Sequence, residues 1–98
     1  MTLLERREAR ANASFEALLR CKEFDRPCRL IDISTRGAQV IVKPAPAKGM
    51  AISLLLEPFG SILADTAWVR GETVGLRFND NPEEIGTILM GLATYAAI

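Results

Sequence analysis

The sequence predicts a mainly β protein, a six-stranded antiparallel β-barrel with a C-terminal α-helix. Three observations support this fold class: short segments in which apolar and polar residues alternate, turn residues at hairpin spacing between them, and a C-terminal segment with apolar residues at helical spacing. A β-sandwich would fit the same strand pattern. We favour a closed barrel because it leaves no unpaired strand edge in so small a sheet. The 98 residues support one domain and leave no room for a second core.

The N-terminal segment is ambiguous between helix and strand. Residues 2–5 have the form of a capping box, and the residues that follow favour a helix. From Ala11 to Leu19, however, every second residue is apolar, which is typical of a half-buried strand. We therefore expect a flexible basic arm over residues 1–11, with room for a helical turn, and one barrel domain over residues 12–98.

Five further strands are predicted from alternation and turn residues, over residues 27–33, 38–42, 51–57, 62–70 and 73–78. Residues 34–37 form a turn in which Gly37 can adopt positive φ, and Gly71 lies in the turn before the last strand. The two prolines of residues 43–49 favour a loop. The apolar residues expected to face inward from three of the strands are Ala38, Val40, Val42, Ile52, Leu54, Leu56, Val74, Leu76 and Phe78.

A helix is predicted at about residues 82–97. Asn81 is a favourable N-cap, Pro82 suits the first helical position, and Glu83 and Glu84 suit the positive end of the helix dipole. The apolar residues at helical spacing are Ile85, Ile88, Leu89, Leu92 and Tyr95. We expect this helix to lie across one mouth or flank of the barrel.

Composition excludes several classes of function. Twelve Lys and Arg balance twelve Asp and Glu, which argues against a DNA-binding protein, and the six aromatic residues are too few and mostly inward for an OB-like binder of single-stranded DNA or RNA. No apolar run approaches the ~20 residues of a membrane span. Residues 1–10 also lack the apolar core of a signal peptide, so we expect no membrane insertion and a cytoplasmic location.

The residues that carry most catalysis are also missing. The chain has no histidine, and its two cysteines, Cys21 and Cys28, do not complete a zinc site by themselves. We expect both thiols to be reduced and at least one to lie in the core. The sequence therefore predicts no catalytic residue, no metal site and no enzyme activity.

Two clusters carry binding chemistry. Arg6, Arg7 and Arg10 crowd into five residues, and Asp32-x-Ser34-x-x-Gly37 forms a turn. Arginine suits phosphate oxygens and the O6/N7 edge of guanine. A carboxylate can accept the N1–H and N2–H₂ donors of the same base, a hydroxyl donates or accepts, and glycine permits close approach. An anionic ligand that contains a purine fits both clusters, and this chemistry alone leaves its identity open.

The chain resembles the PilZ domain, the bacterial receptor module for cyclic di-GMP. The family pattern is Arg-x-x-x-Arg, then Asp/Asn-x-Ser-x-x-Gly, and this chain has RREAR at 6–10 and DISTRG at 32–37. The segment ADTAWVRGETVGLRF at 64–78 is similar to a further family segment. The resemblance implies that Arg6 and Arg10 grip phosphate and guanine with support from Arg7. It also implies that Asp32 and Ser34 hold the other base edges, and that Gly37 shapes the turn.

The resemblance leaves the roles of three other residues open. Trp68 either borders the ligand or fills one end of the barrel, and Arg36 and Arg77 either line the site or are solvated. Many family members carry an arginine just before the Arg-x-x-x-Arg pair, whereas this chain has Glu5. An acid there would repel further phosphates, so we expect one bound nucleotide rather than a stacked pair.

The resemblance implies a cyclic di-GMP receptor or adaptor without a resident cofactor. Ligand binding would change the conformation of the arm and signal to an unidentified downstream protein, in a process such as motility or biofilm regulation. The alternative is a PilZ-fold interaction module that does not bind nucleotide.

Overall fold

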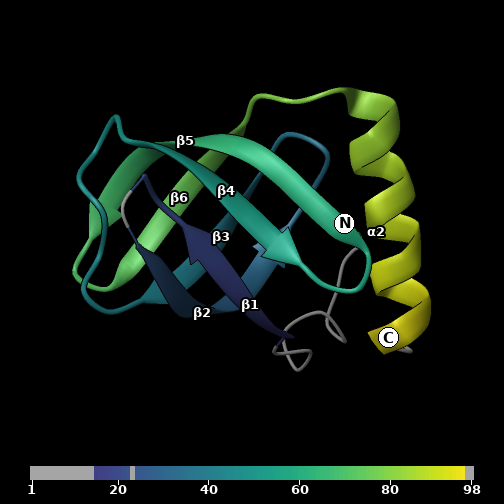
Figure 1. The fold of residues 1–98 in the computed structure, drawn as a ribbon, viewed down its shortest axis with the longest axis horizontal. Helices are drawn as coiled ribbons and strands as arrows, with labels where there is room; N and C mark the ends of the chain where they lie inside the picture. Colours follow the sequence, from purple (N-terminus) through teal and green to yellow (C-terminus); the bar gives the residue numbers. More distant parts are fainter. Residues whose placement is uncertain (1–14, 23, 97–98) are drawn as a thin grey trace.

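The computed structural model describes residues 15–22 and 24–96, so the predicted arm and the first residues of the predicted first strand lie outside it. The described elements are β1 (Phe15–Arg20), β2 (Asp25–Ile33), β3 (Gly37–Val42), β4 (Ala51–Leu56), β5 (Gly60–Arg70), β6 (Thr73–Phe78) and α2 (Pro82–Ala96). The strands close in the order β1-β2-β3-β6-β5-β4, with every neighbouring pair antiparallel, and α2 lies beside one end of the barrel (Figure 1). The predicted fold class is confirmed.

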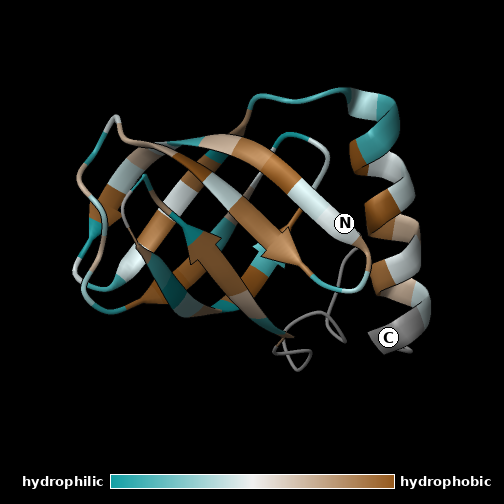
Figure 2. Ribbon diagram, in the orientation of Figure 1, coloured by the Kyte–Doolittle hydropathy of each residue, from teal (hydrophilic) through white to brown (hydrophobic). Residues whose placement is uncertain are grey.

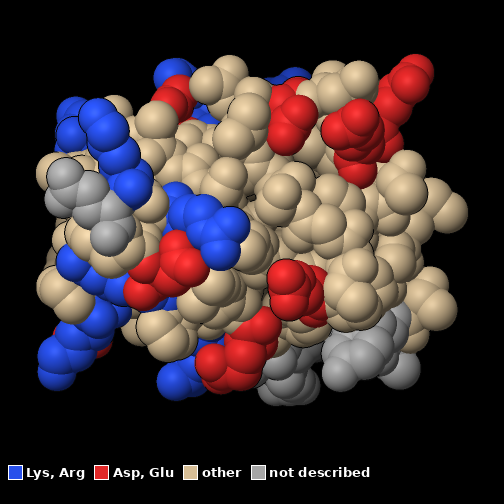
Figure 3. Space-filling model, in the orientation of Figure 1, with Lys and Arg blue, Asp and Glu red and all other residues tan. Residues whose placement is uncertain are grey.

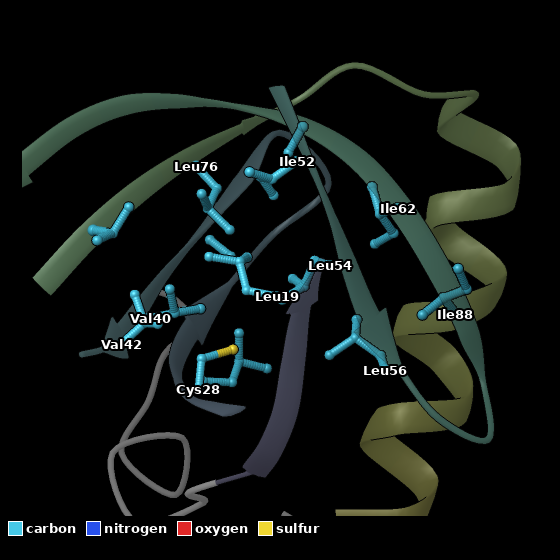
Figure 4. Close-up of a cluster of buried hydrophobic side chains, with 14 of the residues drawn as sticks. Leu19, Cys28, Val40, Val42, Ile52, Leu54, Leu56, Ile62, Leu76 and Ile88 are labelled. Carbon is cyan, nitrogen blue, oxygen red and sulfur yellow. The ribbon is translucent and has the colours of Figure 1, made fainter. Parts of the chain in front are cut away.

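The core fills the barrel because alternate strand residues face inward. Figure 4 shows these side chains converging on the interior, and Figure 2 shows apolar and polar positions alternating along the strands. Leu19, Leu54 and Ile62 have no exposed surface. Phe78, also expected to face inward, is half-buried and packs against the core. Among the described residues, no helix is long and apolar enough to cross a membrane.

Both cysteines are free and buried, as expected. Burial disfavours the thiolate, and it raises the pKa of the Cys28 thiol to about 12. The pKa of the Cys21 thiol is raised for the same reason. Both thiols therefore serve as small apolar residues of the core.

Two strands begin two residues earlier than the alternation predicted, and β3 begins one residue earlier, at Gly37. β2 starts at Asp25 rather than residue 27, because Arg20 pairs with Asp25 across the hairpin and donates two hydrogen bonds of 2.9 and 3.0 Å to its carboxylate. β5 starts at Gly60 rather than residue 62, because Gly60 continues the ladder opposite Leu56. Apolar periodicity does not detect such pairing of polar or glycine residues at strand ends.

Helix α2 begins and packs as its sequence predicts. The Asn81 side-chain oxygen accepts a hydrogen bond of 2.8 Å from the Glu83 backbone N–H, which makes Asn81 the N-cap. Ile85, Ile88 and Leu92 are buried, and the apolar side of the helix faces the barrel in Figure 2. The side chain of Tyr95, expected on the same face, lies outside the described part of the chain.

Candidate functional site

One open hollow on the outer surface of the barrel brings together the predicted site residues that the structure describes. Its volume is about 420 Å³, within the usual range for small-molecule sites. We call it the β3–β6 hollow. The residues on its wall that bear on binding are Asp32, Ser34, Arg36, Gly37, Gln39, Trp68, Gly75 and Arg77.

A β-bulge places Asp32 on this outer surface. Leu30 pairs with Val40 and Asp32 pairs with Gln39, so Ile31 is an extra residue in β2. Without it, Asp32 would follow Leu30 into the core at the next inward position. The bulge instead puts Asp32 opposite Gln39, which is exposed, and the carboxylate stays half-buried at the surface.

A second bulge does the same for Trp68. Thr66 pairs with Leu76 inside the barrel and Trp68 pairs with Gly75, so Ala67 is an extra residue in β5. Thr66 is the last residue of β5 whose side chain faces the barrel interior, and it is 1% exposed. Trp68 therefore lies on the outer face, and the interpretation in which it fills an end of the barrel is wrong.

The two bulges bring four residues into register across four neighbouring strands. Asp32 of β2, Gln39 of β3, Gly75 of β6 and Trp68 of β5 are consecutive cross-strand partners, and we call them the four-strand row. Glycine at position 75 lets the indole lie this close to β6, because a Cβ there would be only 2.1 Å from the indole Nε1 of Trp68. The indole thus lies directly against the backbone of β6 and forms an aromatic wall of the hollow.

The turn after β2 borders one end of the row. The Ser34 hydroxyl accepts a hydrogen bond of 3.2 Å from the Arg36 backbone N–H, and the Ser34 N–H donates to the Gly37 carbonyl at 2.8 Å. The Phe78 N–H donates to the Arg36 carbonyl, which fixes the turn to β6. These hydrogen bonds hold the turn in one conformation beside the hollow.

The predicted role of Gly37 needs correction. Positive φ occurs at Gly49, Gly60 and Gly71, and Gly37 is instead the first residue of β3. A Cβ on Gly37 would lie 2.2 Å from the carbonyl oxygen of Leu76. Glycine is needed here for the close approach of β3 to β6, not for a left-handed turn.

A family model for the PilZ domain matches residues 4–93. The chain belongs to the PilZ domain family. This is a family of cyclic di-GMP receptors, and the match includes both the RREAR and DISTRG segments. A search of curated proteins found no match.

In this PilZ domain, the three N-terminal arginines predicted to bind the ligand, Arg6, Arg7 and Arg10, lie outside the described residues. The hollow has two arginines of its own. Arg36 is exposed, and the exposed Arg77 lies 3.7 Å from the carboxylate of the half-buried Asp65, in a pair that solvent partly screens.

Sequence reasoning assigned no role in the site to two members of the four-strand row, Gln39 and Gly75. Gln39 was visible only as a polar residue between inward-facing Ala38 and Val40, and cross-strand register alone places it beside Asp32. The row offers a carboxylate, an amide and an aromatic face, which suits recognition of a flat polar ring. No set of three or more metal-ligating residues occurs within the described ranges.

Proposed function

We propose that this PilZ domain binds cyclic di-GMP, with one guanine against the four-strand row and the phosphates held by Arg6 and Arg10, supported by Arg7. The observation that carries the proposal is the pair of bulges. They turn Asp32 and Trp68 out of the barrel and align them beside the Ser34 turn.

Each group in the hollow suits one part of a guanine nucleotide. The Asp32 carboxylate accepts from N1–H and N2–H₂, and the Ser34 hydroxyl and the Gln39 amide meet other polar edges. Gly37 lets β3 lie close to β6 beside the turn. Trp68 supplies a stacking or edge contact, worth about 1–3 kcal/mol for a base on an aromatic side chain. Arg36 adds positive charge at the rim, where the ligand carries two phosphates.

Signalling follows from where the arginines are in the sequence. If residues 1–11 close over the hollow when the ligand binds, Arg6 and Arg10 contact the phosphates and a new surface forms that a downstream protein can read. The nucleotide acts as a transient signal, not as a resident cofactor. The domain itself is a receptor or adaptor without catalytic activity.

Calorimetric titration with cyclic di-GMP, GTP and linear diguanylate tests this function. We expect cyclic di-GMP to bind most tightly, with one nucleotide per chain and an affinity that falls with salt. Arg10→Ala and Asp32→Ala should each weaken binding at least about tenfold without changing the melting temperature. Arg29→Ala is the matched control, since Arg29 is exposed on β2 and lies outside the hollow.

Two results would contradict the proposal. Unchanged binding by both Arg6→Ala and Arg10→Ala would exclude the arginine clamp. If cyclic di-GMP produced neither heat nor chemical-shift changes at Ser34, the domain would be the alternative, a PilZ-fold interaction module that does not bind nucleotide.

A further inference from the structure

A second surface lies on the other side of the barrel from the β3–β6 hollow. It is a hollow of about 570 Å³ that extends over β1, β4 and β5, and its apolar wall includes Phe24, Met50 and Leu63. Phe24 is 37% exposed and Leu63 is 54% exposed. The strand order places β1 and β4 away from β3 and β6, so this surface and the β3–β6 hollow can be occupied at the same time.

This hollow continues along β4. A neighbouring hollow of about 420 Å³ shares Arg20 and Ser53 with it and reaches Leu55 and Pro58. We call the two together the β1–β4 groove. Because β4 has six residues, the groove is about 20 Å long at ~3.3 Å per residue.

Positive charge surrounds the apolar end of the groove. Arg20 and Lys22 line it, and the guanidinium of Arg26 lies 3.8 Å from the centroid of the Phe24 ring. Figure 3 shows Lys and Arg gathered at this end of the molecule, with some Asp and Glu beside them and more across the same face and near the start of α2. Two described carboxylates belong to this surface: Asp25 is already engaged by Arg20, and Glu57 lines the other end of the groove. Glu23 lies outside the described residues. An occupant with carboxylates beside an apolar anchor complements this end.

The closed barrel limits how a partner can dock. Every described strand has a paired neighbour on both sides, and the β1–β4 ladder leaves only two consecutive β4 residues at the groove, Ala51 and Ile52, without a partner in β1. Two residues are too few for a peptide to add as a strand. The remaining mode that suits a groove with an apolar wall is an amphipathic helix that inserts side chains. A helix of about 13 residues matches the 20 Å length at ~1.5 Å per residue.

We propose that the β1–β4 groove binds an amphipathic helix of a partner protein, with a large apolar side chain between Phe24 and Leu63 and carboxylates beside Arg20 and Lys22. The helix binds on the side away from the β3–β6 hollow. This proposal does not require that cyclic di-GMP binds, and its test is made without nucleotide.

The test is a titration of the isotope-labelled full chain with a synthetic 13-residue helical peptide that has Leu on one face and Glu on its flanks. The amide signals of Phe24, Ser53 and Leu63 should shift, and those of Gln39 and Gly75 should not. A control peptide with Gln in place of every Glu should bind about tenfold more weakly.

Two variants of the chain test the groove itself. Leu63→Ser and Lys22→Glu should each weaken peptide binding about tenfold or more. Lys43→Glu is the control for charge: it makes the same change at the same end of the barrel but outside the groove, and should keep affinity within about threefold. Leu63→Ser should leave cyclic di-GMP binding unchanged, so failure of the groove and failure of the nucleotide site are distinguishable.

Several results would overturn the proposal. One is that the amide signals do not shift at roughly millimolar peptide, and another is that the Gln peptide binds as tightly as the Glu peptide. A third is that Leu63→Ser and Lys22→Glu bind the peptide as tightly as the parent chain does. If the chain bound anionic lipid vesicles but not the peptide, and Leu63→Ser abolished that binding, the surface would be assigned to a membrane. Self-association that Leu63→Ser abolishes would assign the groove to a second copy of the chain.

Discussion

Replacing Gly75 with alanine tests whether the Trp68 indole lies against β6. The new Cβ would be 2.1 Å from indole Nε1, while non-bonded atoms settle at about 3.5–4.0 Å, so the ring must move outward by about 1.5 Å. The ring is a half-buried side chain that can rotate. Losing part of the ring's packing lowers the free energy of unfolding by about 1–2 kcal/mol. Replacing a glycine within a strand raises it by about 0.5–1 kcal/mol. We expect the free energy of unfolding to fall by about 1 kcal/mol or less.

Gly37→Ala provides the contrast, because its new Cβ meets backbone instead of a side chain. The carbonyl oxygen of Leu76 would be 2.2 Å away, and it cannot move without breaking the β3–β6 ladder. We expect a loss of more than about 3 kcal/mol, because overpacking here displaces the backbone. For a domain of this size, the melting temperature should fall by roughly 12 °C or more.

Fluorescence separates the two variants, since Trp68 is the only tryptophan of the chain. Gly75→Ala should red-shift the emission, increase quenching by acrylamide and weaken cyclic di-GMP binding, with a fall in melting temperature of at most roughly 4–8 °C. Unchanged emission in Gly75→Ala would refute the contact between Trp68 and β6. A Gly37→Ala variant as stable as the parent would refute the close approach of the two strands.

Three further predictions concern groups whose environments the structure defines. Thr66→Val should raise the free energy of unfolding by about 1 kcal/mol in denaturant titration, because Thr66 Oγ1 is buried without a hydrogen-bond partner among the described residues; a destabilised variant would contradict this. With a pKa of about 12, the buried Cys28 thiol should resist iodoacetamide at pH 8 until denaturant is added, and peptide mapping would detect early alkylation. Hydrogen bonds from the Asn81 and Leu63 N–H groups lower the pKa of Asp80. The Asp80 carboxylate therefore stabilises the fold fully above the ordinary carboxyl pKa, and this stabilisation is lost as the pH falls through the lowered pKa. Asp80→Asn should therefore reduce the loss of stability on acidification below the ordinary carboxyl pKa of about 4, and an unchanged pH dependence would contradict that role.

Alternation predicted most of the fold because each strand has one side in the core. The inward positions of β3, β4 and β6, the N-cap at Asn81 and the buried face of α2 all depend on residues close together in the sequence. Local chemistry of this kind is readable without coordinates. The Asp32-x-Ser34-x-x-Gly37 spacing also grouped Asp32 with Ser34, and the family resemblance added a ligand for them. The structure places both residues on one hollow.

The arrangement of the site could not be predicted, because it depends on register between strands. The bulges at Ile31 and Ala67 have no distinct residue signal, yet each moves the following residue from the inside of the barrel to the outside. Gly37 shows the same limit, since a glycine after a turn is compatible both with positive φ and with close backbone approach. Only the position of Leu76 on the neighbouring strand decides between them.

The most direct test of the nucleotide site is to titrate the isotope-labelled chain with cyclic di-GMP and follow the four-strand row. The Trp68 indole N–H signal and the amide signals of Gln39 and Gly75 should move together and saturate at one nucleotide per chain, while the amide of Leu63 stays in place. Binding of cyclic di-GMP that leaves all three row signals unmoved would show that the nucleotide occupies another surface.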